Sequence, residues 1–323
     1  MSKQEAAQPA VHQGVRQPVG FPGLPEGWST EFEFFPSSDG QLNLFAATHH
    51  KKNVTKKSHR ALVILHGFGE HGGRYLHVPH FVQNDIDVVY CLDHRGHGRS
   101  EGQRGHVDQF DLFADDAVLA IKRLDAKLKK EFGRSEIHVL GHSMGSLILF
   151  RSAFLHASAL SKVPVLSMTA SAPFLAVKVA VSPVKKLAAY ALANIWGNLS
   201  ISNPFDPALL SHDKNVCDAY AADRLVHAIM TPKMYTQVQA AMSDTMKRHT
   251  GIKQPLQVLI PLSDGVVDED LSVRFYEELK LKDKLMKTYP DFFHEPMNEI
   301  GKEQVFADIS SWIQKWSPSK ETS

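Results

Sequence analysis

Short apolar runs alternate with longer stretches of helical periodicity along most of the chain. The apolar runs at residues 61–65, 88–92 and 137–140 are typical of strands that are buried on both faces of a parallel sheet. Between them, residues 75–83 and 110–131 space their apolar side chains as an amphipathic helix does. This alternation predicts a mostly parallel sheet with helices on both faces, the α/β class.

The alternation is interrupted once. It stops at Pro173 and resumes with a strand at residues 256–260, and the pattern between these points is mostly helical. We therefore expect an α/β core of residues 30–173 and 255–318, into which residues 174–254 are inserted as a helical cap or lid. The core is completed by strands at 165–169 and 285–289 and by helices near 143–154, 269–279 and 304–316.

The N-terminal part differs from the rest. Residues 1–29 are polar, rich in Gln, Ala and Pro, and lack the apolar run of a secretory signal, so they are predicted to form a flexible arm. Residues 31–35 and 42–48 flank a Ser-Ser-Asp-Gly turn signal and predict a β-hairpin. No apolar run approaches the ~18 residues of a membrane-spanning helix, so we expect a cytoplasmic protein, at most peripheral at a membrane.

Charge and cysteine content narrow the class of protein. The 323 residues include 36 Lys and Arg against 35 Asp and Glu, a balance that gives no reason to expect a nucleic-acid partner. The two cysteines, Cys91 and Cys217, are far apart and form neither a disulfide framework nor a zinc motif. A reducing compartment suits them.

The strongest chemical signal is Gly-His-Ser-Met-Gly at residues 141–145, which matches G-x-S-x-G. A predicted strand enters the motif and an apolar helix leaves it, as the sharp turn that displays a nucleophilic serine requires. Glycines remove the Cβ atoms that would clash in such a turn. We therefore predict that Ser143 is the nucleophile of a serine hydrolase. A chance match to the pattern is the alternative, and the flanking elements argue against it.

A serine hydroxyl needs a base, and in this type of sheet the partners follow the serine in the order acid, then histidine. Asp264 and His294 occur in that order, each just after a predicted strand. His294 is expected to accept the serine proton, and Asp264 to orient the imidazole. Asp268 is the alternative acid, although it could instead cap the next helix.

An oxyanion hole is expected from two backbone N–H groups. One belongs to Met144, directly after the nucleophile, and the other to Phe68 in the glycine-rich loop of residues 66–72. The same loop also matches G-x-G-x-x-G, and Asp93 stands near the end of the next strand. A dinucleotide-binding enzyme is therefore a remote alternative. It would leave Ser143 and its partners unexplained.

Residues 93–102 crowd histidines and charges into one segment. We expect a tight loop in which Arg95 and Asp93 pair with each other and support the wall of the active site. A metal site here would lack a second cluster of ligands elsewhere in the sequence, so no metal is expected.

These motifs together make the chain resemble the monoacylglycerol lipase and lysophospholipase group of α/β-hydrolases, often labelled serine aminopeptidase-like. The resemblance covers roughly residues 31–316. One departure is the Pro-Leu-Ser before Asp264, where the group usually has a glycine. The stretches that carry the resemblance are residues 66–75, 93–105, 141–145, 209–211, 222–226 and 294–299.

The resemblance implies a helical cap over an acyl pocket and no cofactor. It assigns Ser143, Asp264 and His294 as the triad and Phe68 and Met144 as the oxyanion donors. It implies a serine carboxylic-ester hydrolase that releases a fatty acid from a monoacyl lipid, either monoacylglycerol or a lysophospholipid, through an acyl-enzyme. A general carboxylesterase or a serine aminopeptidase is the alternative, and a non-catalytic lipid-binding member is a remote one.

The inserted segment suggests how a lipid could be reached. Residues 176–195 form a largely apolar helical stretch with Lys178, Lys185 and Lys186, followed by Trp196. Such a helix could touch a membrane or micelle and admit an acyl chain, or it could simply pack on the core. We expect no obligate protein partner.

Overall fold

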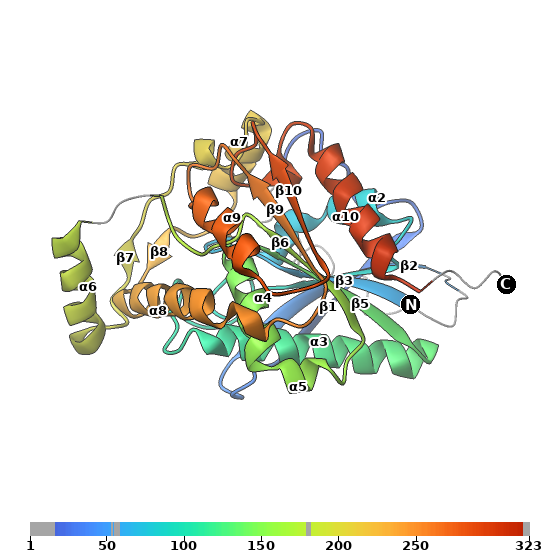
Figure 1. Ribbon diagram of the computed structural model, residues 1–323, viewed down its shortest axis with the longest axis horizontal. Coiled ribbons are helices and arrows are strands. Elements are labelled where there is room, and N and C mark those ends of the chain that lie inside the picture. Colours follow the sequence, from blue (N-terminus) through green and yellow to red (C-terminus); the bar gives the residue numbers. More distant parts are fainter. Residues whose placement is uncertain (1–16, 53, 55–58, 179–181, 319–323) are drawn as a thin grey trace, which may run out of the picture.

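The computed structural model describes residues 17–52, 54, 59–178 and 182–318. An eight-stranded sheet with the order β1-β2-β4-β3-β5-β6-β9-β10 forms its centre (Figure 1). Neighbouring strands from β4 to β10 in that order pair in parallel, whereas β2 is antiparallel to both β4 and β1. The strands are β1 (Trp28–Pro36), β2 (Asn43–Lys51), β3 (His59–Leu65), β4 (Val88–Leu92), β5 (Ser135–His142), β6 (Val165–Ser171), β9 (Leu256–Pro261) and β10 (Lys284–Tyr289).

Helices cover both faces of this sheet, which confirms the predicted fold class. The longer helices of the core are α2 (Val78–Val82), α3 (Asp111–Phe132), α4 (Met144–Leu155), α9 (Glu269–Glu278) and α10 (Lys302–Trp316). Short helical segments are η1 (Gly72–Tyr75), α5 (Ala157–Leu160), η3 (His249–Gly251) and η4 (Pro296–Asn298).

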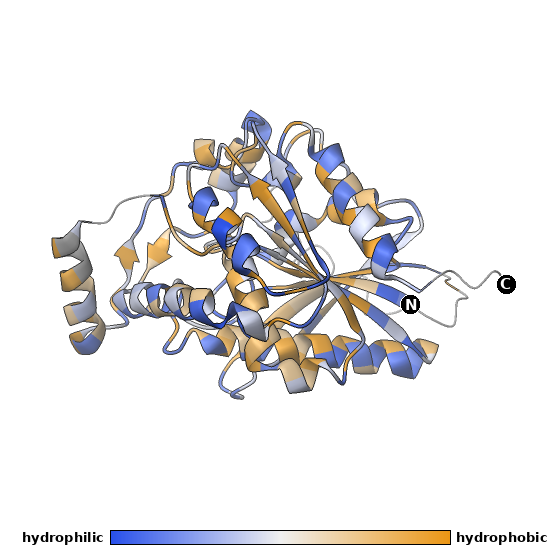
Figure 2. Cartoon of the chain, viewed as in Figure 1, coloured by the Kyte–Doolittle hydropathy of each residue, from blue (hydrophilic) through white to orange (hydrophobic). Residues whose placement is uncertain are grey.

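Strand side chains alternate between two cores, one on each face of the sheet. In β3, Val63 and Leu65 join the apolar side chains of α3 and α4, whereas Leu62 and Ile64 join those of α2 and α10. Burial on both faces explains why the parallel strands read as uninterrupted apolar runs. In Figure 2 the central strands are mostly hydrophobic, while α3 and α10 carry hydrophobic beside hydrophilic residues.

The N-terminal hairpin is confirmed by the pairing of β1 with β2, for example Phe34 opposite Phe45. Of the predicted arm, residues 1–16 lie outside the described residues. The segment that follows them rests on the core, because the Gln17 side chain donates to the Gly73 carbonyl at 2.8 Å. Within the described chain, no helix combines the length and the hydropathy needed to cross a bilayer.

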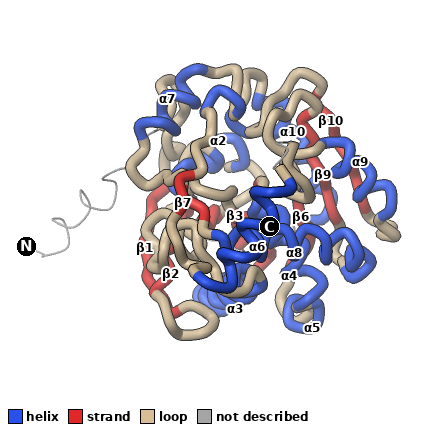
Figure 3. Tube along the Cα trace, turned by 90° about the vertical axis from the view of Figure 1, so that its left-hand side faces the viewer, coloured by secondary structure: helices blue, strands red, loops and turns tan. Residues whose placement is uncertain are grey.

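The described residues between β6 and β9 add no strand to the main sheet. In Figure 1, α6 stands at the left end of the molecule, and Figure 3 looks onto that end. This inserted segment contains α6 (Pro183–Ile195), η2 (Pro207–Leu209), α7 (Lys214–Ala222), α8 (Pro232–Arg248) and a small ribbon of β7 (Ile201–Ser202) with β8 (Ile229–Met230).

The helix predicted from residue 176 is wrong in its first part, because α6 begins only at Pro183. Proline lacks an N–H group and fits the first turn of a helix better than its interior. Before it, Val177 forms a β-bridge with Val267, and the Lys178 ammonium binds Glu269 at 2.6 Å. Lys178 therefore belongs to the wall of the core and not to the cap helix.

Candidate active site

Ser143 occupies the sharp turn between β5 and α4. Its φ of 50° and ψ of −119° lie in a region that a non-glycine residue adopts only at a cost. A Cβ at Gly141 would lie 2.3 Å from the Gly145 carbonyl oxygen, and a Cβ at Gly145 would lie 1.9 Å from that of Leu65. Both glycines are thus required, because the turn packs directly against β3 and against itself.

Three residues predicted to act together lie in one hydrogen-bonded line. His294 Nε2 is 3.0 Å from Ser143 Oγ, and His294 Nδ1 is 2.8 Å from Asp264 Oδ2. The three follow the carboxyl ends of β5, β10 and β9, which are neighbours or near neighbours in the sheet. All three side chains are buried. The arrangement can pass a proton from the hydroxyl to the imidazole.

The structure separates the two candidate acids. Asp264 contacts the imidazole, and its second oxygen accepts from the N–H groups of Val266 and Val267 at 2.7 and 3.1 Å. Asp268 caps α9 by accepting from the Leu271 N–H at 2.9 Å. The turn before Asp264, which lacks the glycine of the resembling group, is held by the N–H groups of Leu262 and Ser263, which donate to the carbonyls of Tyr289 and Phe292 at 2.9 and 3.2 Å.

Electrostatics favour a charged His294–Asp264 pair. Burial acts to raise the pKa of the Asp264 carboxyl, but His294 and the two backbone N–H groups outweigh it and hold the pKa below its usual range. Burial acts to lower the pKa of His294, but Asp264, followed by Glu295 and Glu70, raises it above the ordinary value. These charges would stabilise an imidazolium at position 294.

A second histidine, His142, lies beside this pair, with its ring centroid 5.1 Å from that of His294. Burial, aided by the charge of His294, lowers the pKa of His142 to about 4. At neutral pH it is uncharged, so it does not compete with His294 for the negative charge of Asp264.

The two predicted oxyanion donors lie next to Ser143. Met144 is the first residue of α4, where backbone N–H groups have no partner within the helix. In the described chain neither the Met144 nor the Phe68 N–H donates to another protein group. A Cβ at Gly67 would lie 3.3 Å from Ser143 Cβ, so the loop backbone passes close to the serine.

The direction of the Phe68 N–H follows from a histidine that sequence reasoning did not single out. His66 Nδ1 donates to the Gly67 carbonyl at 2.7 Å, and its Nε2 accepts from the His94 N–H at 3.0 Å. Burial keeps the pKa of His66 well below its ordinary value, so this neutral tautomer is fixed. Because a trans peptide points its C=O and N–H in opposite directions, the Phe68 N–H faces away from His66.

A cavity of about 310 Å³ adjoins the serine. Phe174, Val177, Met230 and Val238 are among its apolar residues, and most of the lining comes from the inserted segment. Neither lysine nor arginine occurs among the described residues that line it, whereas three carboxylates do: Glu70, Asp206 and Glu295.

The inserted segment is bonded to both loops that carry the site. The His227 N–H donates to the Gly69 carbonyl at 2.9 Å, and Asp223 binds His71 Nε2 at 3.1 Å. On the other side, the N–H of His294 donates to the Leu209 carbonyl at 3.3 Å. The residues between α6 and α8 therefore help to hold these two loops in position.

The predicted pair of Arg95 with Asp93 is wrong. Arg95 binds Asp116 on α3 with two hydrogen bonds, of 2.7 and 3.0 Å, and also contacts Asp39 at 3.0 Å. The Asp93 carboxylate instead accepts from the backbone N–H groups of Gly72 and Arg99 at 2.7 and 2.8 Å. Since it binds the protein's own backbone, Asp93 is poorly placed to serve a nucleotide ribose.

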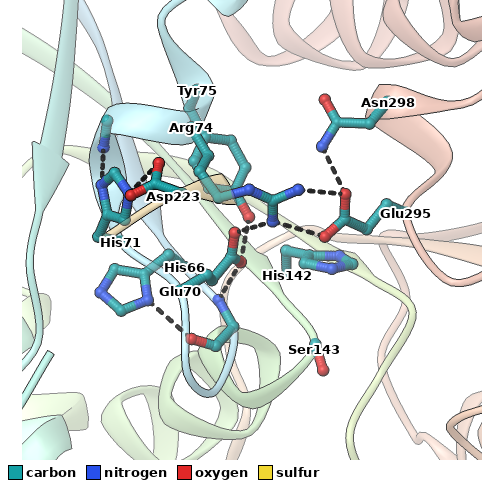
Figure 4. Close-up of polar contacts among 12 residues, drawn as sticks. His66, Glu70, His71, Arg74, Tyr75, His142, Ser143, Asp223, Glu295 and Asn298 are labelled. Atoms are coloured by element: carbon teal, nitrogen blue, oxygen red, sulfur yellow. Dashed lines mark hydrogen bonds and ion pairs between the residues drawn. The ribbon is translucent and has the colours of Figure 1, made fainter. Parts of the chain in front are cut away.

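Three further residues of the site were not identified from the sequence. Glu70 and Arg74 belong to the glycine-rich loop and to η1, and Glu295 directly follows His294 in the sequence. Figure 4 shows these three side chains in contact. The spacing of Glu70 and Arg74 would have allowed an i,i+4 ion pair, but nothing local in the sequence connects either residue to Glu295.

Comparison with known proteins agrees with this geometry. Residues 56–301 match the model of the family described as serine aminopeptidase, S33. A monoacylglycerol lipase of Mycolicibacterium smegmatis is 31% identical over 255 residues, which cover 78% of this chain and 87% of the relative. The human monoglyceride lipase is 28% identical over 260 residues, 79% of this chain and 83% of that protein.

Solved structures agree as well. The monoacylglycerol lipase of Paleococcus ferrophilus superposes with a TM-score of 0.70 and 27% identity, covering 90% of this chain and 100% of that one. A monoglyceride lipase of Saccharomyces cerevisiae has the same fold, with a TM-score of 0.77 at 19% identity, covering 92% and 97% of the two chains. The chain therefore belongs to the family described as serine aminopeptidase, S33, and has the α/β-hydrolase fold.

Proposed function

We propose that this chain is a serine ester hydrolase that releases a fatty acid from monoacylglycerol. The observation that carries the proposal is the line of contacts from Ser143 through His294 to Asp264, at the wall of a largely apolar cavity. Relatives named monoacylglycerol lipase, one of them 31% identical, support this choice of substrate.

The reaction has two halves. Ser143 Oγ attacks the ester carbonyl carbon while His294 Nε2 takes its proton, and the N–H groups of Phe68 and Met144 receive the negative oxygen. His294 then protonates the glycerol oxygen. Glycerol departs, and the acyl group stays bound to Ser143 Oγ. A water molecule, deprotonated by His294, attacks this acyl-enzyme and releases the fatty acid. Each oxyanion donor contributes about 2.7–4 kcal/mol of transition-state stabilisation.

The charges of the cavity favour an uncharged head group. Glu70 and Glu295 share the single positive charge of Arg74, which leaves one negative charge uncompensated beside the cavity. At an effective dielectric constant of about 20, one such charge about 7 Å from a phosphate costs about 2 kcal/mol, or about 30-fold in rate. Glycerol has only uncharged hydroxyl groups, and these can donate hydrogen bonds to carboxylates.

A panel of lipids with the same acyl chain tests the proposal. We expect kcat/KM for monooleoylglycerol to exceed that for oleoyl lysophosphatidic acid by about 30-fold, the figure obtained above from the cavity charge. Released oleate is measured for both, with lysophosphatidylcholine as a zwitterionic comparison. Equal rates for the glycerol and phosphate lipids would contradict the assignment of the head group.

An aminopeptidase is the second candidate, and one observation favours it: carboxylates in a cavity wall could also hold a charged amino terminus. The apolar side chains from the inserted segment argue for an acyl chain instead, since each buried CH₂ contributes about 0.8 kcal/mol. Aminoacyl arylamides assayed beside monooleoylglycerol separate the two. Turnover of the arylamide at the higher kcat/KM would replace the lipase assignment.

We further propose that α6 rests on the lipid surface from which the substrate is drawn. Its apolar side chains are exposed, with Val184 at 77%, Leu187 at 73% and Ile195 at 70%, and Trp196 after it at 64%. The helix packs on α8, which lines the cavity. An exposed apolar helix face beside a lipid-binding cavity matches the form of an interfacial helix.

Replacing Val184 and Leu187 together with glutamate should weaken binding to phosphatidylcholine vesicles by about tenfold or more, because two apolar side chains lose their burial. Sedimentation with vesicles measures it, in a Ser143→Ala background so that no product forms. Phe34→Glu, at another exposed apolar position (61%), on β1, is the control. A double variant that still sediments like its parent would show that α6 is not the contact.

A further inference from the structure

A buried arginine joins the two loops that carry the active site (Figure 4). Arg74 Nη1 donates to Glu70 Oε2 at 2.6 Å and to Glu295 Oε1 at 2.6 Å, and its Nη2 donates to Glu295 Oε2 at 2.8 Å. Glu70 is four residues away in sequence, whereas Glu295 is 221 residues away. Arg74 is thus the middle member of a bridge that joins two segments 221 residues apart in the chain.

The bridge ends on groups that face the reaction. Glu70 Oε1 accepts from the Gly67 N–H at 2.6 Å, in the same loop that presents the Phe68 N–H. Glu295 is the neighbour of His294 in the sequence, so its carboxylate anchors the backbone that carries the imidazole. A continuous chain of contacts therefore connects the loop of residues 66–72 with His294.

The bridge is buried, and each of its two carboxylates accepts a further hydrogen bond. Glu70, Arg74 and Glu295 are all buried. The Tyr75 hydroxyl donates to Glu70 at 2.8 Å, and the Asn298 amide donates to Glu295 at 2.8 Å. Although burial acts to raise the pKa of both carboxyl groups, Arg74 lowers each below its usual range, so both are charged at neutral pH.

Stability alone does not account for such a group. Replacing a buried ion pair by packed apolar side chains often leaves a protein equally stable or more stable. What the bridge does provide is a fixed distance, because a rigid guanidinium that binds Glu295 through two hydrogen bonds and Glu70 through a third holds the two carboxylates at a set separation. Catalytic groups on separate loops need this, since a displacement of about 1 Å can cost about 100-fold in rate.

We propose that Arg74 is a positioning residue, which sets the Gly67–Phe68 backbone and the His294 imidazole at their working separation. The proposal rests on the roles given above to Ser143, His294 and Phe68, but not on the identity of the lipid. It assigns the bridge to the chemical step. Loss of the bridge should therefore lower kcat and leave KM nearly unchanged.

Arg74→Lys tests this, because lysine keeps the charge but cannot bind two carboxylates through a rigid fork. We expect kcat for p-nitrophenyl butyrate to fall by 10- to 100-fold, with KM within about threefold of the native value. The rate of labelling by a fluorophosphonate probe should fall in parallel. Glu295→Gln, which removes one charge and one acceptor for Arg74, should act in the same direction and decides the matter if Arg74→Lys does not fold.

Arg60→Lys is the matched control. Arg60 also binds a buried carboxylate, that of Glu136 at 3.0 Å, but it lies where β3 and β5 begin, at the opposite edge of the sheet. We expect this variant to lose thermal stability and to keep its kcat. If Arg74→Lys and Glu295→Gln behaved like this control, with a lower unfolding temperature but unchanged kcat per labelled active site, the proposal would be overturned.

The same assays separate this inference from the proposed function. Hydrolysis of p-nitrophenyl butyrate that is lost in Ser143→Ala but accompanied by no release of oleate from monooleoylglycerol would remove the lipid assignment alone. Retention of p-nitrophenyl butyrate hydrolysis in Ser143→Ala would remove the roles on which Arg74 depends, and the inference with them.

Discussion

Ser143→Ala is expected to lower kcat for monooleoylglycerol by about 10⁶-fold, because no other group can form the acyl-enzyme and His294 would have no proton to take. Oleate release measures the loss, and the fluorophosphonate probe should no longer label the protein. Circular dichroism should be unchanged, since alanine fits the space of the serine. The residual rate would come from the oxyanion donors and from binding of the substrate.

Ser167→Ala is a fair comparison for this variant. Ser167 is also buried and also contacts a histidine, at 2.8 Å from His138 Nδ1, but it lies on β6 away from the cavity. Its activity should remain within a few-fold of the native value. Hydrolysis by Ser143→Ala at a rate similar to that of Ser167→Ala would rule out Ser143 as the nucleophile.

Asp264→Asn is expected to lower kcat by about 10⁴-fold. An asparagine in this place can donate to His294 Nδ1 and so stabilise the wrong tautomer, and it no longer offsets the charge on the imidazolium. Asp268→Asn serves as control, because asparagine caps a helix about as well as aspartate. Equal losses in the two variants would mean that the contact between Asp264 and His294 does not serve the reaction.

The pH dependence of Asp264→Asn should also change in a defined direction. His294 must be uncharged to accept the serine proton, so kcat/KM falls as the pH drops through the pKa of His294. Asp264 is the largest influence raising that pKa. Without its charge the pKa falls, and the acidic limb of the profile moves to lower pH. A pH–rate profile of the residual activity measures this shift.

Most elements of the sheet core could be predicted from the sequence because their signals are local. A strand buried on both faces must be apolar throughout, and β4 coincides with the predicted run at residues 88–92. The turn at Ser143 demands glycines at fixed positions, which a five-residue pattern records. The same holds for Asp268, whose cap contact reaches only three residues along the chain.

Long-range polar pairs outside the predicted triad could not be predicted in this way. Arg95 was expected to pair within its own loop, but packing brings it to Asp116 on α3. Glu295 meets Arg74 because the parallel strands β3 and β10 point the same way, so the segments that follow their carboxyl ends lie on the same side of the sheet. Local sequence patterns do not predict such contacts, because these depend on the order in which strands that are far apart in the chain lie in the sheet.

The contacts between the inserted segment and the catalytic loops limit how the cavity can open. A rigid-body lift of all residues from 174 to 254 would pull Leu209 off His294 and His227 off Gly69. Such a gate would therefore disassemble the reaction centre each time it admitted a substrate. A movement of α6 alone, with α7 and β8 left in place, would avoid this conflict. Substrate could then enter while the contacts of Leu209 with His294 and of His227 with Gly69 remain formed.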